Sequence, residues 1–184
     1  MEYRVRIDGL ERAVKQFEGL GRKMDPVMRG TLNTTATQSR SKQFMPKLQK
    51  VIPNKAFLRK RLVVKRAGRN RNDSRLIPSS SGIPLHYFAD WVALRVAPTR
   101  AKIFVRGING RRLAAGFINP SSKKQLPLRT RGFRGANGNV YKEALGPSLA
   151  AFFRQVTNAD SYRWINQFLQ AEFERRMKKE LAKL

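Results

Sequence analysis

The sequence predicts an α+β fold in which N-terminal helices, a central antiparallel sheet and C-terminal helices follow one another along the chain. Apolar residues recur at helical spacing near both ends, runs rich in Val, Ile, Phe and Leu fill the middle, and turn dipeptides separate those runs. With 184 residues, 41% of them hydrophobic, the chain is long enough for one packed core. We therefore expect a single domain over residues 1–184 with extended basic arms and loops.

The N-terminal part is expected to form a short strand at residues 3–7 and two helices. Apolar residues at helical spacing from Leu10 to Leu20 predict the first helix. The second begins near Asp25, where Pro26 occupies the first helical position. Small uncharged side chains on this helix favour close packing against a neighbouring helix or a second subunit. These subunit-contact candidates are Thr31, Asn33, Thr34, Thr35, Thr37 and Gln38.

Strand patterns dominate the middle of the chain. Residues 90–97 and 101–108 are apolar runs on either side of a turn at residues 98–100, and the Asn109-Gly110 turn dipeptide leads into a third strand at residues 111–118. Together they predict an antiparallel meander. Weaker strands at residues 124–130 and 139–145 flank a flexible loop, assigned to residues 129–141 for its Gly, Arg and Asn content.

Two further segments complete the predicted layout. Residues 54–82 form a basic arm and loop, in which residues 57–64 resemble a helical turn leading into a strand. Helix returns at residues 147–155 and again in a C-terminal helix over residues 158–184. The expected apolar face of that last helix comprises Tyr162, Ile165, Phe168, Leu169, Phe173, Met177 and Leu181.

The charge of the chain is strongly positive, with 39 Lys and Arg against 12 Asp and Glu, formally +27. Residues 26–142 contain 26 basic residues and two acids, so they carry 26 − 2 = +24 of that charge. A surface this basic attracts polyanions or acidic proteins. The candidate contacts to DNA or to acidic partners are Lys55, Arg59, Lys60, Arg61, Lys65, Arg66, Arg69, Arg71, Arg75, Lys123, Lys124, Arg129, Arg131 and Arg134.

Residues that could carry out catalysis are few. The chain contains no cysteine, and its single histidine, His86, has no carboxylate near it in sequence. No spacing typical of a metal site is present, so we expect no cofactor, no metal and no enzymatic activity. A nuclease is the enzymatic alternative, and it would have to use His86, Asp73 or Asp90. No run approaches the roughly 18 apolar residues of a membrane span, so no membrane partner is expected.

Nonspecific nucleic-acid binding is the more serious alternative, because phosphate contacts require only Lys and Arg on an exposed surface. The sequence has no helix-turn-helix, zinc-finger or aromatic nucleotide-binding pattern, which argues against sequence-specific readout. A free, nucleoid-like DNA-binding protein therefore stays open beside docking to acidic protein neighbours.

Several short motifs occur in an order that resembles a family of phage proteins. They are residues 9–14 (GLERAV), 31–36 (TLNTTA), 57–62 (FLRKRL), 115–118 (AGFI), 126–128 (LPL) and 145–149 (LGPSL). Across residues 9–153 the chain is similar to the minor tail protein Z family of lambda-like phages, which are tail-completion proteins. It departs from that pattern in a long insertion at residues 129–141.

The resemblance implies a structural role at the head-proximal end of the tail, late in assembly. Copies would form a ring, expected to be hexameric, around the channel through which DNA passes. Its partners would be tail terminator, tail tube or head-completion proteins and the backbone of the phage DNA. The chain would belong to the tail or neck of the virion and be assembled in the host cytoplasm, with no catalytic residues.

Overall fold

The structure is a computed structural model, and it describes residues 24–121, 123, 125–135 and 138–182. The strand predicted at residues 3–7 and the helix predicted over residues 10–20 lie outside these residues. For the described chain the α+β prediction is confirmed, with helices before and after a central antiparallel sheet.

The chain divides into two compact units that alternate along the sequence. The first unit contains the described chain up to Met45, then Leu62–Ile77, then the chain from Thr157 onwards. The second contains Pro46–Arg61 and Pro78–Val156. The basic arm predicted over residues 54–82 is therefore divided between them.

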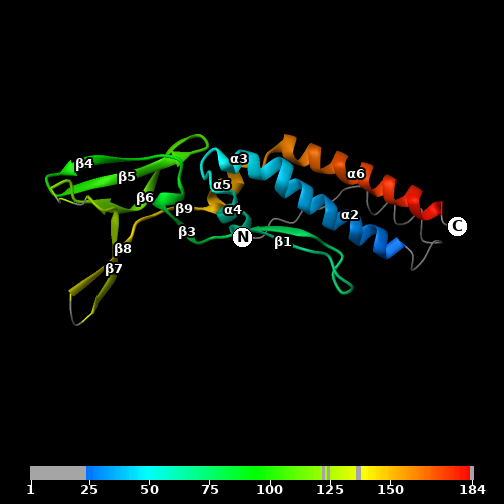
Figure 1. The fold of residues 1–184 in the computed structure, drawn as a ribbon, viewed down its shortest axis with the longest axis horizontal. Coiled ribbons are helices and arrows are strands. Elements are labelled where there is room, and N and C mark those ends of the chain that lie inside the picture. The colour runs from blue at the N-terminus through cyan, green and yellow to red at the C-terminus, as the bar shows by residue number, and fades with distance from the viewer. Residues whose placement is uncertain (1–23, 122, 124, 136–137, 183–184) are drawn as a thin grey trace. The chain divides into compact units, whose positions relative to one another are not determined.

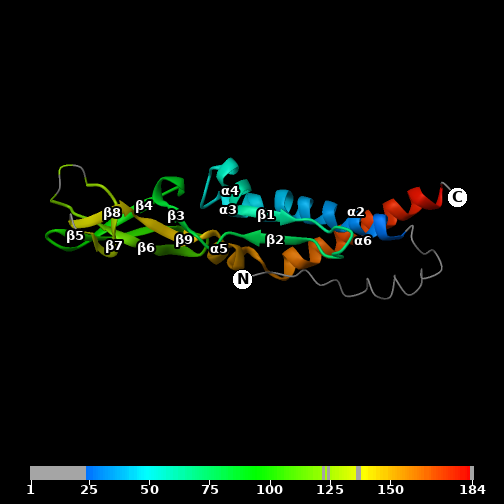
Figure 2. The same ribbon diagram turned by 90° about the horizontal axis from the view of Figure 1, so that it is seen from below.

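The first unit combines two long helices with a hairpin. Its elements are α2 (Met24–Gln38), the π-helix η2 (Ser39–Phe44), β1 (Leu62–Lys65), β2 (Arg75–Pro78) and α6 (Ala159–Leu181). Helices α2 and α6 run side by side and antiparallel in both views (Figures 1 and 2). Leu32 of α2 and Leu169 of α6 belong to one buried cluster with Ala67, which follows β1. This cluster holds the hairpin and both helices together.

Helix α6 begins at a polar cap and buries only part of its predicted apolar face. The Asn158 side chain accepts a hydrogen bond from the Ser161 N–H, which satisfies one of the free donors at the helix start. Of the predicted apolar face, Ile165, Leu169 and Met177 are buried. Tyr162 is 42% exposed, so its assignment to that face is wrong.

The second unit is built on an antiparallel sheet with short helices beside it. Its elements are α3 (Met45–Gln49), α4 (Lys55–Arg61), β3 (Gly82–Pro84), the 3-10 helix η3 (Leu85–Tyr87), β4 (Trp91–Ala97), β5 (Arg100–Gly107), β6 (Gly110–Ile118), β7 (Leu128–Gly135), β8 (Gly138–Glu143), β9 (Leu145–Ser148) and α5 (Leu149–Val156). The first residue of α3 belongs to the first unit. The buried side chains of the second unit include Leu58, Ile83, Ile103, Leu149, Phe152 and Phe153.

The strand order is β3-β9-β6-β5-β4, and the β7–β8 hairpin joins the sheet through β6. The meander β4–β5–β6 was predicted from the sequence and is confirmed, with turns at the two predicted places. The side chains of β5 alternate between the two sides of the sheet, since Ala101, Ile103 and Val105 are at most 3% exposed while Lys102 and Arg106 are exposed.

The loop predicted over residues 129–141 is wrong in its local structure. Strands β7 and β8 pair from Leu128↔Glu143 to Gly135↔Gly138, with a register shift between Thr130 and Arg134. Residues 136–137 lie outside the described chain. Glycine and arginine content favoured a loop, but Phe133, Val140 and Tyr141 are good strand formers, and backbone pairing within a hairpin outweighs the composition.

Candidate polyanion-binding surfaces

The hairpin of β1 and β2, residues 62–78, carries a cluster of positive charges in the first unit, and we call it the basic hairpin. It contains five basic residues and one acid, so its formal charge is 5 − 1 = +4. Its turn is closed by two backbone hydrogen bonds between Gly68 and Arg71, of 2.9 and 3.2 Å. This closed turn lies within the segment that the sequence assigns to a basic arm and loop over residues 54–82.

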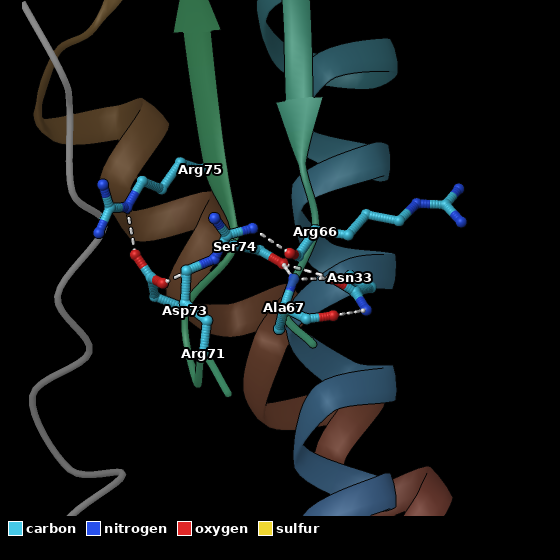
Figure 3. Close-up of polar contacts among 7 residues, drawn as sticks. All are labelled: Asn33, Arg66, Ala67, Arg71, Asp73, Ser74 and Arg75. Atoms are coloured by element: carbon cyan, nitrogen blue, oxygen red, sulfur yellow. Dashed lines mark hydrogen bonds and ion pairs between the residues drawn. The ribbon is translucent and has the colours of Figure 1, made fainter. Parts of the chain in front are cut away.

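One side chain of α2 holds the basic hairpin. Asn33 donates through Nδ2 to the Ala67 carbonyl at 3.2 Å and accepts through Oδ1 from the Ala67 N–H at 2.7 Å. The Ser74 hydroxyl donates to the same Asn33 oxygen. Figure 3 shows Asn33 pointing from the helix towards Ala67 and Ser74, where the two arms of the hairpin approach each other. The amide thus pairs with the hairpin backbone much as a neighbouring strand would.

The single acid of the hairpin, Asp73, pairs with two arginines. Its two carboxylate oxygens contact the Nε atoms of Arg71, at 3.3 Å, and of Arg75 (Figure 3). The Arg71 guanidinium also donates to the Arg66 carbonyl. Arg71 and Arg75 are both half-buried. Their contacts with Asp73 help to hold the hairpin in its conformation. Their charges are partly neutralised at this carboxylate.

The remaining cations of the basic hairpin are exposed. Lys65, Arg66 and Arg69 lie on its surface and form no ion pair with another described residue. Three cations within five positions, on a backbone held by Asn33, present a compact positive surface. Such a surface can bind phosphate groups or carboxylates. Contacts to phosphates do not depend on the base sequence of the DNA.

Helix α4 presents a second group of cations, in the second unit. Asn54 caps it, since its side chain accepts from the Phe57 N–H at 2.9 Å, and Leu58 is completely buried. The exposed cations of α4 are Lys55, Arg59 and Lys60. Arg61 is different: its guanidinium donates to the Ser79 hydroxyl at 3.0 Å and lies 5.3 Å from the centre of the Phe57 ring. Arg61 therefore fixes α4 in place and is a weaker candidate for a partner contact.

The third predicted group lies near and on β7. Lys123 is exposed, whereas Lys124 lies outside the described residues. Arg129, Arg131 and Arg134 belong to β7, whose backbone the structure describes. The fourteen predicted contact residues thus belong to different elements of both units. The groups with described side chains are those from Lys65 to Arg75 and from Lys55 to Arg61.

The uncharged face of α2 makes contacts within the chain. Thr31 and Thr35 are buried, and Thr34 accepts a hydrogen bond from the Arg176 guanidinium of α6 at 2.8 Å. The Thr37 hydroxyl donates to the Asn33 carbonyl, and Gln38 is half-buried. Of these contacts, the hydrogen bond between Arg176 and Thr34 joins this face to a neighbouring helix, in line with one of the two alternatives; the contact with a second subunit stays a prediction.

Sequence reasoning missed a buried carboxylate on α6. Glu172 is 7% exposed and accepts hydrogen bonds from Arg175 at 2.7 and 2.8 Å and from Arg176 at 2.7 Å. The hydrogen bonds from Arg175 lower the pKa of Glu172 most, burial opposes that shift, and Arg176 lowers the pKa further. Because Arg176 also reaches Thr34, this cluster links α6 to α2.

A second missed contact concerns the only histidine. His86 Nδ1 lies 2.8 Å from a carboxylate oxygen of Glu143, so the fold places beside the ring a carboxylate that is distant in the sequence. Both side chains are about half exposed, and the His86 ring also contacts Tyr87. The 57 residues that separate the pair left no local sequence signal.

Two negative findings apply to the described residues. None of them forms a group of three His, Asp or Glu side chains that could hold a metal ion. None of the described helices is long and apolar enough to cross a membrane. Comparisons of the chain with protein-family models, with curated proteins and with solved structures find no match.

Proposed function

We propose that this chain is a structural protein of a tailed-phage virion, a tail-completion or neck component at the head-proximal end of the tail. Copies of it form a ring around the DNA channel, aid head–tail joining and position the DNA. Ring closure by cyclic symmetry requires a heterologous interface between neighbouring copies. The proposal rests on the order of motifs that resembles the minor tail protein Z family and on the exposed cations described above.

The observation that carries the proposal is the way the cations are held. Lys65, Arg66 and Arg69 project from a hairpin whose backbone is hydrogen-bonded to Asn33, and the exposed cations of α4 project from a capped helix. Charges on fixed elements have already lost part of their conformational freedom, so binding an anionic neighbour orders less of the chain. This arrangement suits a protein that stays bound among DNA and acidic subunits.

The first test is the composition and assembly of the virion. Mass spectrometry of purified particles should find this chain in stoichiometric amounts with the other neck proteins. Deletion of its gene should leave tails that assemble but fail to join heads or deliver DNA. A chain absent from purified particles, with normal infection after deletion, would exclude the proposal.

The second candidate function is nonspecific DNA binding by the free protein, and the exposed cations of the basic hairpin favour it. Replacing Lys65, Arg66 and Arg69 together with serine should reduce the salt dependence of duplex binding. Each lost phosphate contact lowers the slope of log K against log salt by about 0.9. This result fits both functions, so deletion, which under this alternative leaves head–tail joining intact, must separate them.

A matched control comes from α6, which carries exposed cations in the same unit. Replacing Arg163, Lys178 and Lys179 with serine removes the same formal charge from another element. If both triple variants lose DNA affinity equally, net charge alone governs binding and the basic hairpin has no special role.

A further inference from the structure

The face of the meander that carries Phe104 is both apolar and basic, and we call it the outer face. Antiparallel register places Val92, Phe104 and Leu113 in one row across β4, β5 and β6. The next row contains Leu94, Lys102 and Phe117. Directly paired residues of antiparallel strands project to the same side of the sheet, so these side chains share one face.

The apolar side chains of the outer face are incompletely covered. Leu94 is 53% exposed and Leu113 is 57% exposed, whereas Ile103 and Val105, on the opposite face of β5, are fully buried. Single exposed apolar residues are ordinary, but two neighbouring rows across three strands form a patch. A patch of this kind marks a surface that another molecule covers.

Basic residues lie at both ends of this patch and within it. Arg100 and Arg106 share the side of β5 on which Lys102 and Phe104 project, and Arg111 pairs with Arg106 across the strands. The Arg100 guanidinium lies 5.9 Å from the centre of the Phe117 ring. From residue 91 to residue 142 the sequence contains no Asp or Glu, and Asp90 lies just outside at the Arg106 end. The outer face therefore combines exposed apolar side chains with cations at both ends of β5 and with Lys102 between Leu94 and Phe117.

The apolar and basic character of the outer face distinguishes between three possible binding partners. Duplex DNA would satisfy the cations but would leave Leu94 and Leu113 without an apolar partner. A second copy of the outer face would bring cations opposite cations, in a chain whose formal charge is already +27. A partner protein with apolar residues bordered by carboxylates would satisfy both parts of the surface.

The dimensions of the patch indicate the form of the partner. Three adjacent strands span two interstrand spacings, roughly 10 Å, which is about the diameter of an α-helix with its side chains. A helix laid on a sheet is a standard way to bury one sheet face. We propose that the outer face of β4–β6 binds an acidic amphipathic helix of another protein. This inference goes beyond the proposed function. It identifies a kind of acidic partner, and it concerns a surface other than the basic hairpin and α4.

The test uses the full-length chain and synthetic helical peptides of about five turns, roughly 18 residues. The probe peptide has leucine on one face and glutamate elsewhere. One control peptide replaces the leucines with serine and keeps the charge, and the other replaces the glutamates with lysine. Fluorescence anisotropy at moderate salt should show the probe binding at least about tenfold more tightly than either control.

Variants of the chain then locate the site. Replacing Leu94 and Leu113 together with serine should weaken probe binding about tenfold, and replacing Arg106 and Arg111 with serine should weaken it mainly at low salt. Val63→Ser is the matched control, because Val63 is 49% exposed but belongs to β1. It should leave binding unchanged. Circular dichroism and thermal melting check that each variant is folded.

Three results would overturn the inference. The first is equal affinity for the leucine and serine peptides, which would mean that charge alone acts. The second is self-association of the wild-type chain that the Leu94 and Leu113 replacements abolish, which would make a second copy the occupant. The third is loss of duplex DNA affinity in the same variant. If virions lack the chain but the probe still binds the outer face, only the proposed function fails.

Discussion

Replacing Asn33 with alanine tests whether one α2 side chain holds the basic hairpin. The substitution removes the hydrogen bonds of the Asn33 amide to the Ala67 N–H and carbonyl and to the Ser74 hydroxyl. The Ala67 N–H keeps a contact to the Ser74 hydroxyl at 3.1 Å, but the Ala67 carbonyl loses its side-chain donor. Ala67 is only 9% exposed, so water replaces that donor poorly.

The magnitude follows from these contacts. A typical hydrogen bond contributes about 0.5–1.5 kcal/mol net, so three of them contribute roughly 3 kcal/mol. Alanine is the better helix former by about 0.6 kcal/mol, which offsets part of the loss. We therefore expect Asn33→Ala to lower the free energy of unfolding by about 2 kcal/mol. Asn33→Asp keeps the acceptor but loses the donor, and it should lie between Asn33→Ala and the wild type.

The assay is urea unfolding followed by circular dichroism, with Asn70→Ala as the control. Asn70 lies in the turn of the same hairpin, is exposed, and should change stability by less than about 0.5 kcal/mol. Hydrogen exchange of the Ala67 amide adds a local measurement, since its protection should fall in Asn33→Ala. If Asn33→Ala matches the Asn70→Ala midpoint and keeps that protection, the hairpin is not held as described.

Three further substitutions test separate parts of the fold. The pKa of Glu172 is lowered from 4.5, chiefly by hydrogen bonds from Arg175, so the ionised carboxylate stabilises the protein fully above pH 4.5 and less as the pH falls through the lowered pKa. Glu172→Gln should be destabilised by about 1–2 kcal/mol at pH 7, and melts at decreasing pH should show this difference shrinking below pH 4.5. Gly146→Ala would place a methyl group 2.5 Å from the buried Phe88 ring and should lower stability by about 1–3 kcal/mol in urea titrations, whereas an unchanged midpoint would contradict this packing. His86→Gln removes the exposed contact between His86 and Glu143 and should change the free energy of unfolding by less than about 0.5 kcal/mol. A larger loss of stability would show that the histidine has another role.

The elements that the sequence predicts well are those with a local periodic signal. Strand β5 alternates buried and exposed residues as its pattern requires, and the Asn109-Gly110 dipeptide lies at the turn between β5 and β6. Helix α2 is found where it was predicted, although its described part begins at Met24, so Pro26 is not its first residue. In each case the information lies within a few residues of the element that it determines.

Contacts between distant residues had no such signal. Asn33 and Ala67 are 34 residues apart, and nothing in the TLNTTA motif indicates that its asparagine binds a hairpin backbone. Charged residues are usually exposed, so nothing in the sequence indicates that Glu172 is buried; its burial depends on hydrogen bonds from two arginines one helical turn away. The outer face of the meander follows from strand register, which a single strand pattern does not fix.

The interleaving of the two units has a consequence for biosynthesis. Helix α2 is translated well before its hydrogen-bonding partner on α6, because Arg176 follows Thr34 by 142 positions. The second unit, whose final segment ends at Val156, can close while α6 is still being made. Premature termination shortly after Val156 would therefore spare the residues of the sheet but leave α2 without the helix that packs along it.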